Sequence, residues 1–375
     1  MDSYRGARTA MIVGAGVAGL TAAAALAGAG WQVEIAELNP SRATSGWGLC
    51  LTGPALRALA GLGLADACLT EGYGMGVITH LDVDGEPVGQ ARPPRLLGAR
   101  RPAMAGIARP VLHRILHAEA EQRGVVVHQG MTVTAVDQDG GLVHVQLSDG
   151  TVRQVALLVG ADGIRSTTRS LLGLETSPDY HGQMVWRALV PRPQWATGIH
   201  QFAGRTDTAG LVPISVSQAY VFLTENGVEQ SVLPEAELAP RLKQLLEAFP
   251  GRVAEIRPLV SGSESVVRRP VLTAFLEGAW NRGNAVVIGD AAHAPAPHMA
   301  SGAALAIEDG LVLAEELGRH RSVGAGIEAF VRRRRQRCRT LVETSVTIAG
   351  LERVQRHREA YPLMDAGHRL MAEPA

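Results

Sequence analysis

Lysine is almost missing from this chain, and cysteine is scarce. Lys243 is the only lysine among 375 residues, so arginine supplies nearly all of the positive charge. The three cysteines, Cys50, Cys68 and Cys338, are far apart and form no Cys-x-x-Cys pair. This spacing argues against a disulfide framework and against a zinc site, and it is typical of the reducing cytoplasm. We therefore expect a cytoplasmic protein without a metal centre.

The chain also lacks an excess of charge and long apolar runs. Basic and acidic residues number 36 each, so the formal net charge is zero. This balance argues against a nucleic-acid partner and against an acidic membrane surface. The apolar stretch that follows the polar N-terminus is soon broken by glycines, which predicts neither a signal peptide nor a membrane span. The sequence leaves the oligomeric state open.

The first part of the chain alternates between strand and helix patterns. Residues 9–13 form a β-like run that ends in glycines, residues 20–29 are rich in strong helix formers, and residues 31–36 form a second β-like run. Together they predict a βαβ unit with a right-handed crossover. Further elements are expected as helices over 54–62 and 111–122 and as strands over 125–136, 142–147 and 152–160.

The pattern changes after about residue 175. Short β-like runs separated by turns predict an antiparallel sheet over residues 184–190, 198–203, 210–216 and 219–224. A helix is expected next over 238–248, then a buried strand over 285–288, and finally two long helices over 303–317 and 323–351. We predict an α/β, Rossmann-type nucleotide-binding fold, interrupted by an antiparallel β-sheet substrate domain and completed by long C-terminal helices. The expected domains are 1–175 with a small β insert near 76–105, then 176–275, then 276–375.

A glycine-rich motif joins the first predicted strand to the first helix. Residues 13–20 read Val-Gly-Ala-Gly-Val-Ala-Gly-Leu. Gly14 allows a tight turn, Gly16 lets a pyrophosphate approach the backbone, and Gly19 lets helix and strand pack closely. Glu37, at the end of the second strand, would bind adenosine ribose hydroxyls and repel a 2′-phosphate. The motif predicts FAD or NAD, without separating the two; the alternative is a glycine-rich turn with no ligand.

Two further motifs each follow an apolar strand. Residues 160–166 read Gly-Ala-Asp-Gly-Ile-Arg-Ser, and residues 285–293 read Ala-Val-Val-Ile-Gly-Asp-Ala-Ala-His. With three motifs in this order and a helix that begins near Arg109, the sequence resembles the group A flavoprotein monooxygenases, the family of para-hydroxybenzoate hydroxylase and salicylate hydroxylase. The resemblance covers nearly the whole chain, and it implies that the bound dinucleotide is FAD.

The resemblance implies a role for each matching residue. Glu37 would hold the FAD ribose, and Arg109 would contact the FAD phosphate and ribityl region. Asp162 and Gly163 would lie near the pyrophosphate and the path of the nicotinamide. Asp290 would bind ribityl or pyrophosphate hydroxyls. Both aspartates could also act as helix N-caps, and the two roles are compatible because a cap next to a phosphate orders the same loop.

One stretch departs from the family pattern. Where the family usually has a Gly-Gln-Gly-like sequence, residues 299–303 read Met-Ala-Ser-Gly-Ala. A helix that begins at Gly302 and Ala303 would still aim its N–H groups at the flavin pyrimidine ring, where they stabilise negative charge on the reduced flavin. We therefore expect FAD binding to be retained.

The resemblance also implies a reaction. In this family NADH or NADPH reduces the flavin, O2 adds at C4a, and the distal oxygen of the C4a-hydroperoxyflavin attacks an electron-rich substrate carbon. The expected function is an FAD-dependent monooxygenase that oxygenates a small aromatic or polyketide-like substrate. Some members activate a phenol with the histidine of a Gly-His-x-x-Tyr-Arg strand. Here residues 182–187 read Gly-Gln-Met-Val-Trp-Arg, so that histidine is replaced by glutamine.

Three residues are candidates for the substrate side. Gln183 and Arg187 share one face of the predicted strand, opposite Trp186, and would be polar contacts in a cleft. His298 precedes the flavin-facing helix, and its ordinary pKa is close to neutral pH, so it is the candidate proton relay. His293, by contrast, is expected to be structural. The substrate pocket should lie between residues 180–224 and residues 294–301, because ligand sites favour domain junctions.

Three other functions are possible for a protein with these motifs. A flavin-dependent halogenase needs a lysine in the N-terminal half, and none precedes Lys243. An FAD-dependent reductase or dehydrogenase of the geranylgeranyl-reductase kind, without oxygen insertion, is the alternative enzyme. A flavoprotein kept as a binding module is the alternative without catalysis. Oxygen consumption coupled to a gain in product mass would separate the monooxygenase from both.

Overall fold

The strands that carry the three motifs lie next to one another in the central sheet of the computed structural model. The structure describes residues 8–39 and 47–375. The sheet has the order β18-β19-β12-β1-β2-β8, and all neighbouring pairs are parallel except β18 with β19. Its strands are β1 (Thr9–Val13), β2 (Gln32–Glu37), β8 (Val126–Gln129), β12 (Leu157–Gly160), β18 (Asn281–Arg282) and β19 (Ala285–Val287). β1, β12 and β19 are almost wholly apolar and buried, as expected for parallel strands that are covered on both faces.

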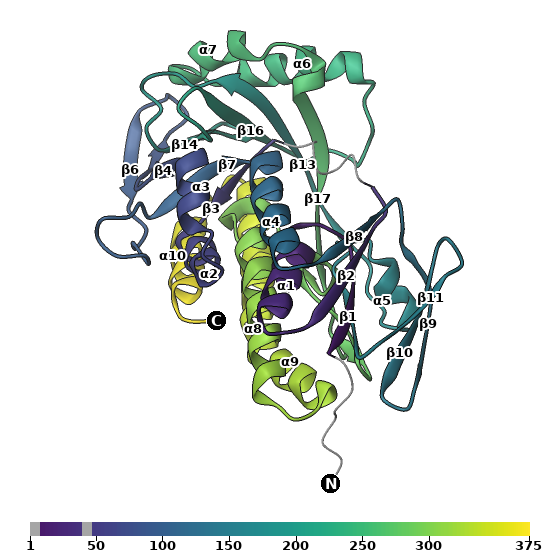
Figure 1. Cartoon of the computed structure of the whole chain (residues 1–375). Helices are drawn as coiled ribbons and strands as arrows, with labels where there is room; N and C mark the ends of the chain where they lie inside the picture. Colours follow the sequence, from purple (N-terminus) through teal and green to yellow (C-terminus); the bar gives the residue numbers. More distant parts are fainter. Residues whose placement is uncertain (1–7, 40–46) are drawn as a thin grey trace.

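Helices pack closely beside this sheet (Figure 1). α1 (Val17–Gly28) is rich in alanine and buried along most of its length. It packs against α8 (Gly302–Arg319) and α4 (Arg109–Gln122). Small residues allow this approach, since a Cβ at Gly310 would lie 2.6 Å from the backbone nitrogen of Ala22. A small antiparallel sheet leads back to β12 and consists of β9 (Val133–Asp139), β10 (Leu142–Leu147) and β11 (Val152–Val155).

A second large sheet has eight strands in the order β20-β17-β13-β16-β15-β14-β5-β6. Its strands are β5 (Ile78–Leu81), β6 (Pro87–Ala91), β13 (Asp179–Pro191), β14 (Ile199–Ala203), β15 (Thr208–Pro213), β16 (Gln218–Asn226), β17 (Val266–Phe275) and β20 (His293–Ala294). α6 (Glu235–Leu246) and α7 (Arg252–Ile256) lie over one face, at the top of Figure 1. Trp186 is buried in the core on that side, and its indole N–H donates to Glu225 at 2.9 Å.

The remaining elements connect the two large sheets. A three-stranded sheet of β3 (Gly48–Leu51), β7 (Met104–Ala108) and β4 (Tyr73–Met75) lies beside α2 (Gly53–Gly61) and α3 (Ala65–Glu71). α5 (Thr167–Leu171) follows β12, and the short 3-10 helices are η2 (Arg257–Leu259), η3 (Ser263–Ser265), η4 (Gly289–Ala291) and η5 (Pro297–Met299). The chain closes with α9 (Val323–Arg353) and α10 (His357–Ala372), which pack against each other, and both also contact η5.

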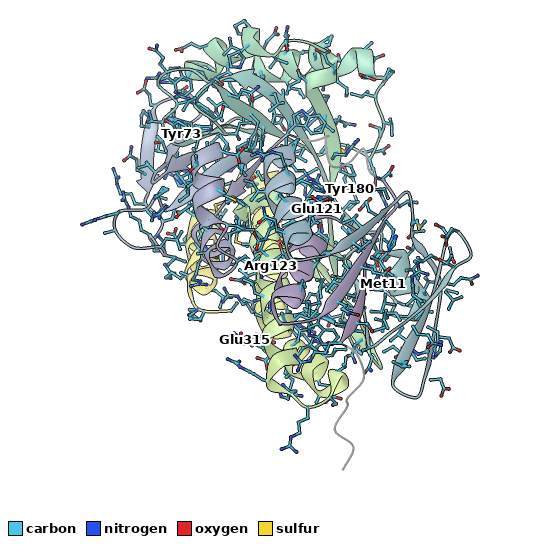
Figure 2. All side chains as sticks on the ribbon, in the orientation of Figure 1. Met11, Tyr73, Glu121, Arg123, Tyr180 and Glu315 are labelled. Carbon is cyan, nitrogen blue, oxygen red and sulfur yellow. The ribbon has the colours of Figure 1, made fainter. Side chains whose placement is uncertain are left out.

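Figure 2 locates individual side chains in the nucleotide-binding half and near the substrate sheet. Met11 of β1 is fully buried in the nucleotide-binding half, whereas Tyr73 of β4 lies near the substrate sheet. Glu315 of α8 lies at the lower edge of the view, away from the substrate sheet. In the part of the chain that the structure describes, no helix is both long enough and apolar enough to cross a membrane.

The expected fold class is confirmed: a Rossmann-type fold is interrupted by an antiparallel sheet and followed by long helices. Two expected strands, over 125–136 and 152–160, are each divided in two. β17 and α10 were not expected. The domain boundaries at 175 and 275 stay a prediction. The small insert near 76–105 contains β5 and β6, and these two strands join the substrate sheet beside β14.

Candidate active site

The three motifs meet because their strands are neighbours. β1, β12 and β19 are parallel, so their carboxyl ends lie at the same edge of the central sheet. Gly14 follows β1 with a φ of +99°, and a Cβ there would lie 2.7 Å from the carbonyl oxygen of Ala161. A Cβ at Gly19 would clash with the carbonyl oxygen of Gly14. Protein packing itself therefore requires glycine at both positions.

Gly16 differs from these two glycines. Its φ of −75° is accessible to any residue, and a Cβ there would meet no atom of residues 8–39 and 47–375 within 4 Å. It caps α1, whose first N–H groups lack helical partners and are free to bind an anion. No contact with the described residues requires glycine at this position, so the approach of a ligand stays the prediction for it. This is the space that a dinucleotide pyrophosphate needs.

Glu37 lies at the end of β2, beside the same turn. Its Oε2 accepts a hydrogen bond from the backbone N–H of Ala15 at 2.7 Å, and its Oε1 accepts from that of Asn39 at 2.6 Å. These bonds orient the carboxylate before any ligand arrives, and each oxygen retains a further acceptor position. The arrangement fits the two hydroxyls of a ribose.

Arg109 and Asp290 come from distant parts of the sequence to the same region. Arg109 is the first residue of α4, and its backbone N–H donates to the Trp47 carbonyl at 2.8 Å. Asp290 is exposed to solvent, although many protein atoms surround its carboxyl group. Burial raises the Asp290 pKa, and the nearby charges of His293 and Arg109 oppose this rise. A carboxylate and a guanidinium at one site suit the hydroxyls and phosphates of FAD.

Asp162 orders the second motif. Its carboxylate accepts hydrogen bonds from the backbone N–H of Thr168 at 2.9 Å and from the hydroxyl of Ser166 at 2.5 Å. Gly163 follows with a φ of +85°. The N-cap of α5 is Ser166, which accepts from the backbone N–H of Arg169 at 2.9 Å, so the alternative of Asp162 as the N-cap is wrong; Asp162 instead orders the loop that precedes the helix. Arg169, which sequence reasoning missed, is buried and donates to the carbonyl of Ala291 at 2.8 Å, so it ties this loop to the third motif.

The flavin-facing segment has an unusual backbone. Ala300 adopts a left-handed conformation with a φ of +49°, at the point where the family usually has a glycine-rich sequence. α8 begins at Gly302, with Ala303 as its second residue, so the expected helix start is present. The open position at Gly16, the oriented Glu37 and the Arg109–Asp290 pair together fit FAD. When bound, FAD supplies the redox chemistry, and these residues would hold it.

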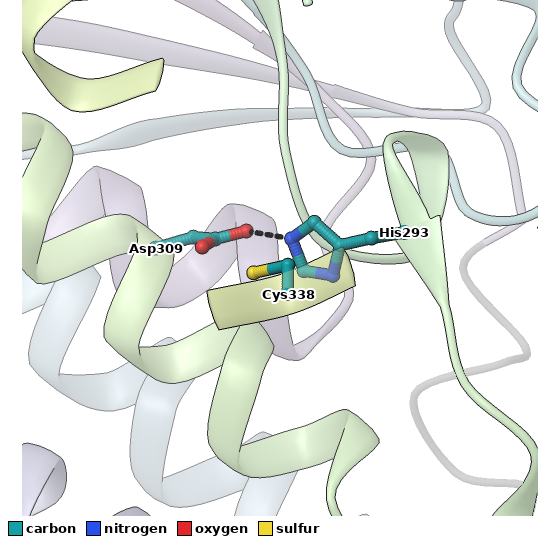
Figure 3. Close-up of side chains that lie close together, drawn as sticks. All are labelled: His293, Asp309 and Cys338. Carbon is teal, nitrogen blue, oxygen red and sulfur yellow. Dashed lines mark hydrogen bonds and ion pairs between the residues drawn. The ribbon is translucent and has the colours of Figure 1, made fainter. Parts of the chain in front are cut away.

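A buried ion-pair network supports the third motif (Figure 3). His293 Nε2 lies 2.6 Å from Asp309, whose carboxylate also accepts from the backbone N–H of Gly289 at 2.8 Å. Arg334, fully buried, donates to the same carboxylate at 2.8 Å. Burial alone would raise the Asp309 pKa, but the charges of His293 and Arg334 outweigh it and lower the pKa to about 2. His293 therefore has structural partners, in line with its expected role.

The same cluster has the donor types of a metal site. His293, Asp309 and Cys338 place their ligand atoms within 4.8 Å of one another. However, the Arg334 guanidinium already neutralises the carboxylate, and a second cation beside it would be repelled. We interpret the cluster as an ion-pair network that fixes α8 and α9 to the Gly289–Asp290 turn.

A cavity of about 750 Å³ lies between the substrate sheet and residues 297–300. Its walls also include residues from β5, β6, α2, α9 and α10; most of its surface is apolar. This is where the sequence placed the substrate pocket. The contribution of α10 was not foreseen, and it includes Tyr361 and His368. Cavities of this size and character are typical of small-molecule sites.

The three candidate substrate residues have different positions. Arg187 lines the cavity, its buried Nε has no hydrogen-bond partner in residues 8–39 and 47–375, and its guanidinium lies 5.9 Å from the centre of the Tyr220 ring. His298 also lines the cavity. Gln183 is not among the lining residues; its buried amide donates to the Asn226 side chain at 2.6 Å. Its assignment as a cavity contact therefore has no support from this geometry.

Residues 7–345 match the family model described as an FAD binding domain. The chain belongs to the group A FAD monooxygenases. It is 33% identical to 2-heptyl-3-hydroxy-4(1H)-quinolone synthase of Pseudomonas aeruginosa strain UCBPP-PA14, over 82% of this chain and 80% of that protein. It is 30% identical to 6-hydroxynicotinate 3-monooxygenase of Pseudomonas fluorescens, over 82% and 83%. The Klebsiella pneumoniae HpxO structure with FAD and uric acid has a TM-score of 0.84, with 23% identity over 99% and 94% of the chains, and shows the same fold.

Family membership confirms the resemblance seen in the sequence, the enzyme class and the FAD cofactor. This monooxygenase is thus of the aromatic-hydroxylase type. The roles of its individual residues stay predictions that rest on the geometry above. The structure differs most from the expectation at His298, which was the candidate proton relay because of its ordinary pKa. His298 is buried, and burial, together with His181, lowers its pKa to about 4. At neutral pH it is an uncharged imidazole and a weak base.

Proposed function

We propose that this monooxygenase uses NADH or NADPH and O2 to hydroxylate a small, electron-rich aromatic substrate in the cavity between the substrate sheet and residues 297–300. When bound, FAD would supply the oxygenating chemistry. The protein places the substrate ring against the flavin, excludes water and assists the loss of a substrate proton. Epoxidation and Baeyer–Villiger insertion are further outcomes of the same chemistry.

The observation that carries this proposal is the position of the cavity. One wall is the segment from Pro297 to Ala300, just before α8, the helix that would face the flavin, and the opposite wall is the substrate sheet, whose lining side chains are partly apolar and partly polar. A flat aromatic ring fits between such walls, and water would be displaced when it enters. The relatives' names point to nitrogen heteroaromatic rings, namely a 4(1H)-quinolone and 6-hydroxynicotinate. We extend this substrate class, with phenols and polyketide-like aromatics, to the present chain.

The test is a stimulation screen with the FAD-loaded protein. Quinolones, hydroxypyridines, phenols and polyketide-like aromatics are added singly, and the oxidation of NADH and of NADPH is followed together with product mass. We expect at least one compound to accelerate oxidation and to gain one oxygen atom derived from isotope-labelled O2. A product that is reduced, or dehydrogenated without gaining oxygen, would favour the reductase or dehydrogenase alternative. No stimulation by any compound would favour a binding module.

The proposal also places the protein in the cytoplasm. All three cysteines are free and buried, which supports a reducing compartment.

A further inference from the structure

A buried glutamate lines the cavity and is not among the residues assigned to FAD. Glu352 lies in the last turn of α9, is 2% exposed, and has one carboxylate oxygen, Oε2, without a hydrogen-bond partner in the described ranges. Glutamate is almost never fully buried unless it is paired, because desolvation of the charged form is costly. A carboxyl group of this kind at the wall of a substrate cavity calls for a functional explanation.

The groups around Glu352 do not neutralise it. His298 on η5 is nearest, with its Nε2 3.5 Å from Glu352 Oε2, and Thr208 on β15 faces the carboxyl group. Tyr361 on α10 also faces it, and His181 on β13 lies beyond His298. None of these groups is a permanent cation. The adjacent Arg353 donates to the His181 carbonyl oxygen at 3.4 Å instead.

The pair with His298 is better described as neutral than as an ion pair. A close carboxylate and imidazolium would raise the histidine pKa and lower the glutamate pKa. Here burial dominates: it raises the Glu352 pKa to about 7, against the opposing effect of the nearby Thr208 hydroxyl, and lowers the His298 pKa to about 4. At neutral pH the imidazole is therefore uncharged, and Glu352 exchanges a proton readily.

We propose that Glu352 is the proton acceptor of this monooxygenase, and that it takes the proton from an aromatic N–H or O–H group of the substrate. The inference rests on the proposed function. In this step the substrate N–H or O–H bond breaks, an O–H bond forms on the carboxylate, and the electron pair stays on the substrate. The ring becomes richer in electrons at the carbon that is to be oxygenated, and no oxidation state changes.

The chemistry of the cavity favours Glu352 over the other candidates. A general base works best when its pKa is close to the working pH, which Glu352 satisfies and His298 does not. Arg187 carries a permanent charge and cannot accept a proton. His298 then acts as a positioning residue that packs against the carboxyl group. The same argument defines the substrate: a neutral ring with a weakly acidic donor fits this end of the cavity, whereas a carboxylate there would be repelled by Glu352.

The experiment uses the FAD-loaded full chain, the variant Glu352→Gln, and two probes: 2-methyl-4(1H)-quinolone and its N-methyl analogue, which has no N–H to donate. Glutamine keeps the size of the side chain but cannot accept the proton. We expect Glu352→Gln to lower oxygenation of the N–H probe by about 10²–10⁴-fold, the usual contribution of a general base, and to change that of the N-methyl probe less than about threefold. Equal losses on both probes, or none on either, would overturn the inference. Glu343→Gln, an exposed position on the same helix, is the matched control and should behave as wild type.

A second measurement does not depend on turnover. Infrared difference spectra of the FAD-loaded protein, recorded from about pH 5 to about pH 9, should contain a carboxylic acid band that titrates near neutral pH, well above an ordinary glutamate. The band should persist in Glu343→Gln and vanish in Glu352→Gln. Its absence from wild type would overturn the inference even if the probes are oxygenated. A present band with no oxygenation of either probe would instead support the proton acceptor and refute the proposed quinolone substrates.

Discussion

Gly16→Ala tests whether the glycine-rich turn is shaped by the protein or by the ligand. Alanine accepts the observed φ of −75°, and its Cβ would meet no atom within 4 Å in the part of the chain that the structure describes. The folded chain should therefore tolerate it, apart from about 0.5–1 kcal/mol because alanine is a poorer N-cap than glycine. The added methyl group nevertheless occupies the side of the turn that a pyrophosphate must approach.

The expected cost to FAD binding can be worked out from this geometry. If the methyl group holds the pyrophosphate away from the first N–H groups of α1, at least one hydrogen bond to a charged phosphate is lost. Such a bond contributes about 1.5–3 kcal/mol, which corresponds to about tenfold to a hundredfold in Kd. Gly14→Ala is the contrasting variant. It forces alanine to a φ of +99° and brings its Cβ 2.7 Å from Ala161, so it should destabilise the protein itself by about 1–3 kcal/mol or more.

Two measurements separate these effects. Thermal unfolding of the FAD-free proteins should show a Tm close to wild type for Gly16→Ala and a lower Tm for Gly14→Ala. Titration with FAD, followed by quenching of flavin fluorescence, should show weaker binding for both. If Gly16→Ala binds FAD with the wild-type Kd, or if it lowers the Tm as much as Gly14→Ala does, the pyrophosphate does not lie against this turn.

Three further predictions concern the region around the flavin. His298→Ala should leave FAD occupancy unchanged and lower steady-state turnover less than Glu352→Gln does, since a histidine whose pKa burial lowers to about 4 is a weak base; an equal or larger loss would make His298 the base. Asp309→Asn should lower the urea-derived free energy of unfolding by about 3–5 kcal/mol, because buried Arg334 loses its countercharge. Since the Asp309 pKa is lowered to about 2, this contribution should be fully present above about pH 4 and disappear as the pH falls toward 2; a difference between wild type and variant that stays constant over this range would contradict the assignment. Ala300→Gly should change the free energy of unfolding by no more than about 0.5 kcal/mol. Ala300→Val places a β-branched residue at a φ of +49° and should lower that free energy by about 1–3 kcal/mol, which a lower Tm would reveal. Equal effects of the two variants would show that the left-handed turn is absent.

The residues of the cofactor half of the site can be predicted from short, local stretches of sequence. Gly14 and Gly19 are needed by the backbone of one turn, and Glu37 ends the next strand, so a short window is enough to predict them. The second and third motifs follow the same rule, because each begins directly after an apolar strand. Parallel pairing then brings the three strand ends to one edge, a step that the right-handed βαβ rule makes nearly automatic.

The substrate half depended on contacts between distant segments. Gln183 and Arg187 have the same strand periodicity, yet the cavity includes only Arg187, since the Gln183 amide is paired with Asn226. Periodicity gives the face of a strand but not what covers each point along it.

The sequence by itself predicted the nucleotide-binding fold, because that fold depends on backbone conformations that only certain residues adopt. Its resemblance to a known family predicted the FAD cofactor and the enzyme class. Tertiary structure alone decided which titratable groups line the cavity. Glu352 reads in the sequence as one more polar position near the end of a helix, and His298 as an imidazole of ordinary pKa. Packing of α9 and α10 against the substrate sheet and η5 buries both groups. Desolvation, which no local pattern encodes, then moves the two pKa values in opposite directions, so our proposal assigns to Glu352 the proton transfer that the sequence suggested for His298.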